Sequence, residues 1–454
     1  MRLDRSRTAL FAAMLAAGGL IAGRAAAQNQ APQPETPPSG TPTIRIVGSA
    51  RQRVPIALPP VSGGDNGRSQ DAATTIHDVV RDDLLFSGYF QVVPDEYLKM
   101  VGPFRDRAAS YKEWQGIGAE AILVGQAQAD GLSGIVFEGQ VFAVSEQRAV
   151  VGKRFRGDQQ QVRIIAHKMS DALVEHYIGK PGIATSRIAY VSQVGKGKEI
   201  FVMDYDGARP KRITANGSMN RSPAWSPKSK SDEAERIALV SLRSGSPELL
   251  ILDASGDLKR AFPQKGELNS APAWSPDGRL LAFSSSRDGN AEIYTLRIDD
   301  NVLTRLTKDP GIDTAPTWSP DGRSIAFTSD RGGSPPIYLM DADGGRVRRL
   351  TSELSYCDSA SWSPNTEEGD RIAFAARVPG GFDIFSYDLK SAQLTRLTDG
   401  GGINESPRWS PDGRHLVFAS DRSGGSDIYT MDANGDHVRR LTRGGSNQMP
   451  SWSR

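Results

Sequence analysis

Short apolar runs separated by turn residues recur along the second half of the chain. Three of them follow one another between Ala315 and Thr351, in "APTWSPDGRSIAFTSDRGGSPPIYLMDADGGRVRRLT", and close copies lie on both sides. Apolar runs of four to six residues, bounded by Gly, Pro, Asp and Ser, predict β-strands joined by tight turns. "SPDG" has the composition of a type I turn, and "DADGG" has that of a hairpin turn.

Tryptophans mark the period of this repeat. They are 49, 44, 44, 47 and 43 residues apart, at Trp225, Trp274, Trp318, Trp362, Trp409 and Trp452. Each period contains a Trp strand and three further strands, such as "IAFTS", "IYLM" and "VRRLT". Repeats of about 40–50 residues with four strands each are typical of β-propeller blades. Each strand type occurs six times, which predicts six blades over residues 185–454.

The two ends of the repeat region complement each other. The first copy begins at "IAYVS" with no Trp strand before it, and the last copy ends at the Trp strand "PSWSR". Pairing the last strand with the first three completes one blade and removes the open edges of the ring. We therefore predict an all-β six-bladed propeller that is closed by its C-terminal strand. The Trp side chains are expected to fill the wedges between blades. The Arg pairs of "VRRLT" are interpreted as outer-edge charges that oppose aggregation.

Between residues 43 and 181 the pattern mixes two periods. "VPIALPP" and "AEAILVG" predict buried strands, whereas residues 71–88 place Ile76, Val79 and Leu84 at helical spacing and end at Gly88. Residues 158–179 repeat the helical spacing and end at Gly179. Strands interleaved with helices predict a small α/β domain over residues 43–181. The protein is thus expected to have two domains, with "KPGIATS" as the hinge between them.

The first 27 residues have the order of a secretory signal peptide: a basic start, an apolar run over residues 8–21, and an Ala-x-Ala site at residues 25–27. A membrane anchor is the alternative, but the apolar run is short for a membrane span. Gln28 follows the cleavage site where a lipid anchor would need Cys. Residues 28–42 are Pro-rich and without aromatic residues, and we expect them to form a flexible leader.

Charge and cysteine content restrict the function. The full chain has a net charge of +2, and removal of the signal peptide leaves 51 basic and 52 acidic residues, a balance of −1. This balance removes the compositional argument for nucleic-acid binding. Cys357 is the only cysteine, so no intramolecular disulfide can form, and the fold depends on buried apolar cores.

The chain contains no catalytic motif that we can identify. Neither Gly-x-Ser-x-Gly nor His-Glu-x-x-His occurs. "GIGAEA" precedes an apolar run instead of following one, which excludes a dinucleotide loop. "DADGG" begins like a calcium loop, but the twelfth position is Ser352 instead of Glu. His167 and His176 are nine residues apart and thus on opposite faces of a helix, so we interpret both as surface residues. We expect no catalytic residue, no cofactor and no metal-ligand motif.

One set of residues remains a candidate binding site. The Trp strands are innermost in a propeller, so the six loops that enter them gather at one mouth of the central channel. These loops carry polar residues and a few apolar ones: Asn220, Asn269, Asp313, Thr314, Asp358, Asn404, Glu405 and Gln448, with Met219, Leu268 and Met449. Loops held on a rigid ring favour a binding surface. Ordinary loop polarity is the alternative, and Asp313, Asp358 and Glu405 form a second hypothesis, a cation site.

The signal peptide, the α/β region and six blades of the type "WSPDG…IAFTSDR…IYLMDADGG…RRLT" together resemble the TolB family, the periplasmic component of the bacterial Tol–Pal system. Similar blade motifs occur in propellers of prolyl oligopeptidase-like enzymes, but the domain order and the missing hydrolase domain match TolB. The resemblance covers almost the whole chain after residue 27. It implies a non-enzymatic, monomeric protein of the periplasm.

The resemblance also implies partners. TolB proteins bind the lipoprotein Pal at the propeller mouth and TolA through an N-terminal segment, and they support outer-membrane integrity and constriction at cell division. By motif, the Pal-facing residues include Leu268, Asn269, Ala271 and Thr314, and the TolA-binding segment is Thr43, Ile44, Arg45, Ile46 and Val47. Other outer-membrane proteins or lipoproteins are further candidate partners, whereas nucleic acid and membrane insertion are not expected. The alternative function is an exported hydrolase or a carbohydrate-binding protein.

Overall fold

The computed structural model describes residues 53–228, 235–263, 269–364 and 369–453. Residues Val54–Arg454 form one compact unit. The predicted signal peptide, the Pro-rich leader and the strand over residues 43–47 lie outside the described residues. No helix in the described ranges is long and apolar enough to cross a membrane.

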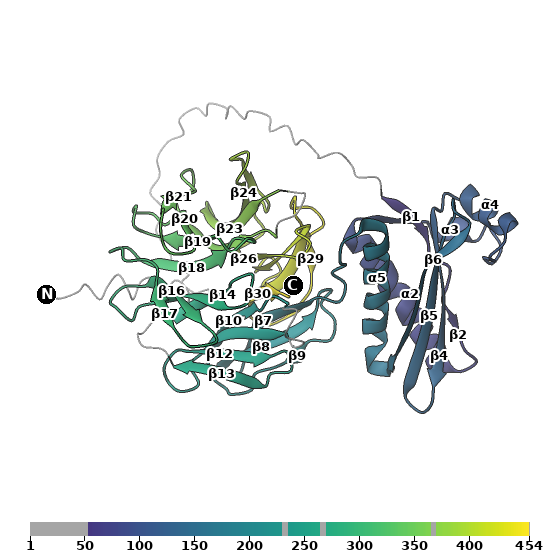
Figure 1. Ribbon diagram of the computed structural model, residues 1–454, viewed down its shortest axis with the longest axis horizontal. Coiled ribbons are helices and arrows are strands. Elements are labelled where there is room, and N and C mark those ends of the chain that lie inside the picture. The colour runs from purple at the N-terminus through teal and green to yellow at the C-terminus, as the bar shows by residue number, and fades with distance from the viewer. Residues whose placement is uncertain (1–52, 229–234, 264–268, 365–368, 454) are drawn as a thin grey trace, which may run out of the picture. The chain divides into compact units, whose positions relative to one another are not determined.

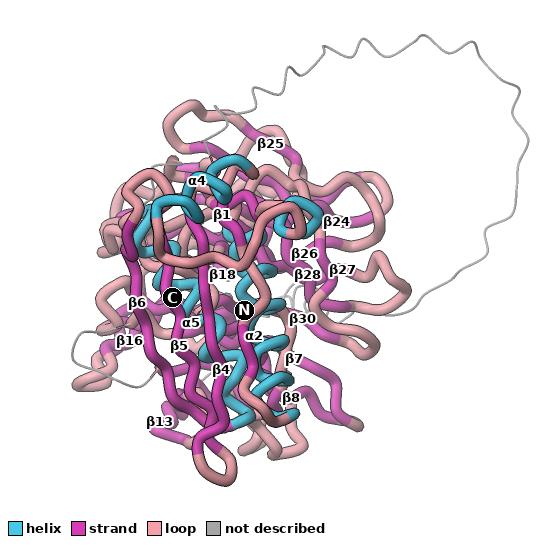
Figure 2. The backbone as a smooth tube through the Cα atoms, turned by 90° about the vertical axis from the view of Figure 1, so that its right-hand side faces the viewer, coloured by secondary structure: helices cyan, strands magenta, loops and turns pink. Residues whose placement is uncertain are grey.

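The first part of the compact unit is a mixed sheet with the strand order β3-β1-β4-β5-β6, in which β2 also pairs with β4. Its strands are β1 (Val54–Ala57), β2 (Ser62–Gly63), β3 (Phe90–Val92), β4 (Ala121–Asp130), β5 (Gly134–Ala143) and β6 (Arg148–Asp158). Its helices are α2 (Gly67–Ser87), α3 (Asp95–Leu98), α4 (Ala108–Gly116) and α5 (Val162–Ile178), with a short 3-10 turn, η1 (Gln159–Gln161). Helices α2 and α5 pack against each other and cover the same face of the sheet (Figures 1 and 2).

The two long helices end where the sequence predicts, but α2 begins earlier than predicted, at Gly67, and α5 begins at Val162, after the η1 turn. The side chain of Asn66 accepts a hydrogen bond from the backbone N–H of Ser69 and caps the start of α2. Gly88 and Gly179 end α2 and α5 with φ values of 68° and 73°, which glycine adopts without a steric penalty. The apolar faces of both helices meet the sheet in one buried core. The predicted α/β architecture is therefore confirmed.

The second part of the compact unit consists of six four-stranded antiparallel sheets (Figure 1). Five of these sheets are each made of four consecutive strands. Blade by blade, they are β10 (Asn220–Trp225), β11 (Arg236–Ser241), β12 (Glu248–Asp253) and β13 (Leu258–Pro263); β14 (Asn269–Trp274), β15 (Leu280–Ser285), β16 (Glu292–Arg297) and β17 (Leu303–Arg305); β18 (Asp313–Trp318), β19 (Ser324–Ser329), β20 (Ile337–Asp341) and β21 (Arg348–Arg349); β22 (Cys357–Trp362), β23 (Arg371–Val378), β24 (Gly381–Asp388) and β25 (Leu394–Arg396); and β26 (Asn404–Trp409), β27 (His415–Ser420), β28 (Asp427–Asp432) and β29 (Arg439–Arg440). They form a six-bladed β-propeller with the sixth sheet, as predicted.

The sixth sheet closes the ring. Its order is β30-β7-β8-β9, so the last strand, β30 (Asn447–Trp452), pairs with the first propeller strand, β7 (Arg187–Val194); β8 (Gly197–Asp204) and β9 (Lys211–Arg212) complete it. The antiparallel register places Asn447 opposite Ser192 and Trp452 opposite Ile188. The predicted closure by the C-terminal strand is confirmed.

The Trp strands form the inner wall of the ring. Each contacts the next in the cycle β10–β14–β18–β22–β26–β30 and back to β10. The Trp side chains lie between neighbouring blades: Trp225 packs with Val191 and Ile200 of the preceding blade. The indole N–H of Trp318 donates to the carbonyl oxygen of Ala273 in the preceding blade at 3.2 Å. The predicted wedge role of the Trp side chains agrees with this geometry.

One Arg of the predicted pairs has a further role. Arg440 reaches inward and contacts the buried carboxylate of Asp427 at the start of the third strand, and the single Arg305 contacts Glu292 in the same way, whereas Arg349 donates to the carbonyl oxygen of Thr351. Both carboxylates are fully buried. The interpretation as edge charges alone is therefore wrong for Arg440, because the short outer strand leaves its long side chain free to fold back over its own blade; Arg348, Arg349 and Arg439 are exposed.

His167 also departs from prediction, because only 2% of its side chain is exposed. Helix α5 turns this residue toward Asp83 of α2 and toward Asp204 at the end of β8, at 2.9 Å and 3.8 Å. The surface assignment failed because helical spacing identifies which residues share a face, but not which neighbour covers that face. His176, on the other side of the helix, is exposed as expected.

Candidate functional site

The inner strands of all six blades run in the same direction, so their first residues gather at one mouth of the channel. The first position is occupied by Asn220, Asn269, Asp313, Cys357, Asn404 and Asn447. All six side chains are buried within the blades. Four of them were predicted to face a partner, and the structure places these four, Asn220, Asn269, Asp313 and Asn404, behind the mouth surface.

Asn404 shows what this first position does. Its amide nitrogen donates to Asp383 at 2.9 Å, and its amide oxygen accepts from Arg422 at 2.8 Å. Asp383 also accepts a hydrogen bond from Thr398 at 2.7 Å and contacts Arg396. Every polar group of the set therefore has a partner, which a buried carboxylate requires. Asn220 and Asn447 donate in the same way to Glu199 and Asp427.

Asp313 differs from the Asn residues at this position, because it places a second carboxylate next to Glu292. One oxygen of Asp313 accepts from Arg331 at 2.7 Å, and the other, Oδ1, is buried without a hydrogen-bond partner. Burial raises the pKa of Asp313 to about 6, and the nearby charge of Glu292 adds to this effect although Ser329 and Arg331 oppose it. The carboxylate is thus destabilised in its ionised form.

We expect the substitution Asp313→Asn to stabilise the protein at pH 7. An Asn side chain can donate to Glu292 and accept from Arg331, which reproduces the arrangement around Asn404. The folded pKa of Asp313 lies above the ordinary value of 3.8, so stability is lost as the pH rises from about 4 to about 6, and the full loss is present at pH 7. Urea unfolding should show a gain of about 2 kcal/mol at pH 7, from two pKa units at about 1.4 kcal/mol each, discounted for relaxation.

The pH dependence provides the control for this prediction. At pH 4 the wild-type carboxyl is protonated, so the difference between the two proteins should almost disappear. Equal stabilities at pH 7, or a difference that grows as the pH falls, would contradict a buried carboxylate at position 313.

The second positions of the inner strands line the mouth. They include Arg221, Asp358, Glu405 and Gln448, all of which keep some exposure to solvent. Lys198, from the start of β8, donates from its ammonium group to the side-chain oxygen of Gln448 at 3.0 Å. This contact joins two strands of the blade that closes the ring.

Charges at the mouth influence one another across blades. Burial raises the pKa of Glu405, and the negative charges of Asp358 and Asp421 raise it further, whereas Lys198 lowers it. Burial lowers the pKa of Lys198, and Arg221 lowers it further. Burial also raises the pKa of Asp358. The mouth therefore offers carboxylate, ammonium and amide groups on neighbouring strands, and Lys198, Asp358, Glu405 and Gln448 all keep some exposure to solvent.

The third positions of the inner strands share an unusual backbone conformation. All six are non-glycine residues with φ between 49° and 58°: Ser222, Ala271, Ala315, Ser359, Ser406 and Met449. The register of each inner strand shifts at this point, so each blade has a β-bulge. Each bulge follows a second position, four of which (Arg221, Asp358, Glu405 and Gln448) line the mouth, and bulges with strained φ values are frequent at functional sites.

The structure thus brings together some of the predicted residues and separates others. Asp358, Glu405, Gln448, Met449, Met219 and Ala271 are partly or fully accessible, whereas Asn220, Asn269, Asp313, Thr314 and Asn404 are buried. Leu268 lies outside the described residues. Sequence reasoning missed Lys198 and Arg221. Arg221 follows the predicted Asn220 directly, which is a signal that was available, whereas Lys198 lies on a different strand.

The second hypothesis, a cation held by Asp313, Asp358 and Glu405, receives no geometric support. Asp313 is buried inside its blade, whereas Glu405 is exposed at the mouth. Within the described ranges, the one group of three His, Cys, Asp or Glu residues close enough to share an ion lies elsewhere, at His167, Asp204 and Asp206.

Comparisons with known proteins find the same two-part organisation. The family model for the TolB beta propeller domain matches residues 174–368 and 361–454, and the model for the TolB amino-terminal domain matches residues 42–150. A crystal structure of TolB from Acinetobacter baumannii is similar at 29% identity and a TM-score of 0.72, covering 89% of this chain and 97% of that one.

Curated relatives match over a shorter stretch. The Tol-Pal system protein TolB of Methylobacillus flagellatus is 34% identical over 188 residues, which is 41% of this chain and 43% of that protein. The protein of the same description from Roseobacter denitrificans is 34% identical over 225 residues, 48% of each chain. The chain therefore spans between two fifths and one half of the length of these relatives.

Proposed function

This chain belongs to the TolB family, and we propose that it is a periplasmic binding protein that links Pal at the outer membrane to TolA of the inner-membrane complex. The relatives described above carry the name of the Tol-Pal system. In this role the protein would support outer-membrane integrity and constriction at cell division. It would act by binding alone, without a catalytic step.

The observation that carries the proposal is the mixed-charge mouth of a rigid, closed ring. Glu405, Asp358 and Gln448 present acceptors and donors at the mouth beside the ammonium group of Lys198, and the bulges that follow the first three fix their backbone. A preorganised surface binds a protein partner without the entropic cost of ordering loops. We propose that Pal contacts this mouth through Glu405, Asp358, Gln448, Met449, Met219 and Ala271, while the buried Asn220, Asn269, Asp313, Thr314 and Asn404 position them; Leu268 is a further candidate contact.

The second partner would bind a different part of the chain. We propose that residues 43–47, "TIRIV", add as a strand to a sheet of TolA. Strand addition derives its affinity from backbone hydrogen bonds and its specificity from alternate side chains, so an alternating five-residue segment suits it. A protein that binds Pal with one segment and TolA with another can hold both partners at the same time.

One co-purification experiment tests both parts. The Glu405→Arg substitution reverses a charge at the mouth and should reduce capture of the Pal periplasmic domain at least tenfold, with TolA capture unchanged. Deletion of residues 43–47 should reduce TolA capture and leave Pal capture measurable. Both proteins should melt at the wild-type temperature, because neither change removes a buried side chain from the described residues.

Asp299→Arg is the matched control. Asp299 follows β16 in an exposed turn at the opposite end of its blade, and it carries the same charge change as the Glu405 variant. Full Pal capture by Glu405→Arg, or equal losses in both variants, would refute the mouth assignment. Equal loss of Pal and TolA in the deletion would argue against separate sites.

A further inference from the structure

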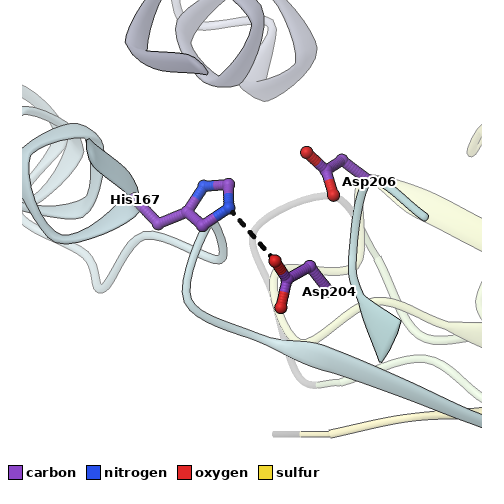
Figure 3. Close-up of side chains that lie close together, drawn as sticks. All are labelled: His167, Asp204 and Asp206. Atoms are coloured by element: carbon purple, nitrogen blue, oxygen red, sulfur yellow. Dashed lines mark ion pairs between the residues drawn. The ribbon is translucent and has the colours of Figure 1, made fainter. Parts of the chain in front are cut away.

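A buried polar cluster joins α5 to the first propeller blade. His167 of α5 lies beside Asp204 and Asp206, which stand on either side of Tyr205 where β8 ends (Figure 3). One ligand atom from each of His167, Asp204 and Asp206 lies within 4.8 Å of the other two. Their side chains are 2%, 9% and 10% exposed. Carboxylates and a histidine so deep in a protein require compensation for the loss of water.

The orientation of the His167 ring is fixed from its far side. Nδ1 lies 2.9 Å from one oxygen of Asp83 and 3.1 Å from the other, and the hydroxyl of Tyr205 donates to Asp83 at 2.6 Å. Asp83 therefore accepts the Nδ1 proton. Nε2 then points toward Asp204 and has no hydrogen-bond partner, although it is buried. A histidine whose Nδ1–H is held by a carboxylate and whose Nε2 faces further oxygens is the arrangement seen at metal sites.

We propose that His167, Asp204 and Asp206 bind a divalent transition-metal ion of the zinc class. One imidazole nitrogen and two carboxylate oxygens are ligands that zinc accepts, with water at a fourth position. Bonds of about 2.0–2.1 Å in a tetrahedral site separate neighbouring ligand atoms by about 3.3 Å. Nε2 of His167 and the nearer oxygen of Asp204 are 3.8 Å apart. The three ligand atoms, which lie within 4.8 Å of one another, therefore have to move closer together to reach this spacing.

Two arginines support the carboxylates. Arg209 donates to both oxygens of Asp204 at 2.8 Å, and Arg163 pairs with Asp206. Each carboxylate oxygen has two lone pairs, so these contacts leave capacity for a metal and hold the ligands in place, as outer groups do at metal sites. A metal ion would have to compete with a proton for Nε2. Burial lowers the pKa of His167, but hydrogen bonds and charge interactions with Asp204 and Asp83 have the larger effect and raise this pKa to about 9.

Such an ion would connect two parts of the fold. His167 comes from the α/β layer, whereas Asp204 and Asp206 come from the blade that closes the ring. Metal binding would therefore clamp α5 to this blade and raise the stability of the whole chain, because an ion that binds only the folded state shifts the unfolding equilibrium. This site is separate from the mouth and does not depend on the proposed partners.

The test uses the full chain, stripped with EDTA and titrated with zinc chloride by calorimetry. We expect one zinc ion per chain and an increase in melting temperature. Asp206→Asn and His167→Gln should each weaken zinc binding at least 100-fold, and Asp83→Asn should weaken it about 10–100-fold because the ring loses its orienting carboxylate. The His176→Gln variant, an exposed histidine on the same helix, should bind zinc like the wild type.

Asp206→Asn decides the outcome if the His167 variant fails to fold, because Asp206 is the most exposed of the three ligands. Its metal-free melting curve establishes that it is folded. Absorption by bound Co²⁺ gives a second readout, which should disappear in Asp206→Asn. Zinc binding that is unchanged in Asp206→Asn and His167→Gln would overturn the proposal, and so would a wild-type protein that binds no zinc, in which a proton alone occupies Nε2.

Discussion

Removal of residues 447–454 should abolish the cooperative folding of the propeller. The deletion takes away β30, which supplies the inner strand of the closing blade, and it leaves unpaired edges on β7 and on the ring. Trp452, 5% exposed, packs with Ile188 and Tyr190, and its loss alone is worth about 3–5 kcal/mol.

Further contacts disappear with the same strand. Loss of Asn447 removes one hydrogen-bond donor from Asp427. Loss of Ser453 removes the hydroxyl oxygen that accepts a hydrogen bond from the backbone N–H of Arg187 at 2.8 Å. The summed loss approaches the whole stability of an ordinary domain, about 5–15 kcal/mol. Thermal unfolding followed by circular dichroism should therefore show a midpoint lower by at least about 10 °C, or no transition at all.

Two controls separate closure from general truncation damage. Deletion of residue 454 alone, which leaves β30 complete, should melt like the full chain. A synthetic peptide of residues 443–454, added to the truncated protein, should restore part of the lost transition because it can pair with β7. A truncated protein that unfolds cooperatively at the wild-type temperature would contradict the closed ring.

The Asp383→Ala substitution should destabilise the protein by about 3–5 kcal/mol. Asp383 is fully buried and accepts hydrogen bonds from Thr398 and Asn404 while it pairs with Arg396. Removing the carboxylate leaves a partly buried guanidinium and a buried amide without their acceptor, and breaking such a pair costs far more than forming it contributes. Urea unfolding at pH 7 measures this loss.

The chain itself supplies the matched control. In the blade of β20, Pro336 stands where the other blades have the acid, and the following inner strand begins with Cys357 instead of Asn. The hydroxyl of Thr351 then lies 3.6 Å from the Cys357 sulfur, and Arg349 is exposed. The double variant Asp383→Ala, Asn404→Cys imitates this blade and should recover part of the loss. A single variant with wild-type stability would show that the buried network contributes nothing.

The sequence predicted the architecture because the propeller repeats itself. Six Trp strands at a nearly constant spacing, and two incomplete copies at the ends, determine both the number of blades and the closing pair. Glycines 88 and 179 likewise marked the ends of the helices, since each must adopt a positive φ. The repeat spacing and the helix-ending glycines can be read from a single sequence, because they depend on residues that are close together in the chain.

The candidate site was predicted only in part, because its chemistry depends on register. Asn404 and Glu405 are neighbours in sequence, yet one is buried against Asp383 and the other lines the mouth, since alternate residues of a strand face opposite sides. The bulge at Ser406 could not be foreseen either, because no glycine marks its φ of 55°. The burial of His167 depends on Asp83 and Tyr205, 84 and 38 positions away in the chain.

The central claim is that Pal binds at the mouth of the ring, and photo-crosslinking tests it most directly. A photoreactive residue at position 448, beside Lys198 in the closing blade, should crosslink to the Pal periplasmic domain, and the same residue at position 299, in a turn at the opposite end, should not. Crosslinking from position 299 with none from position 448 would contradict the account.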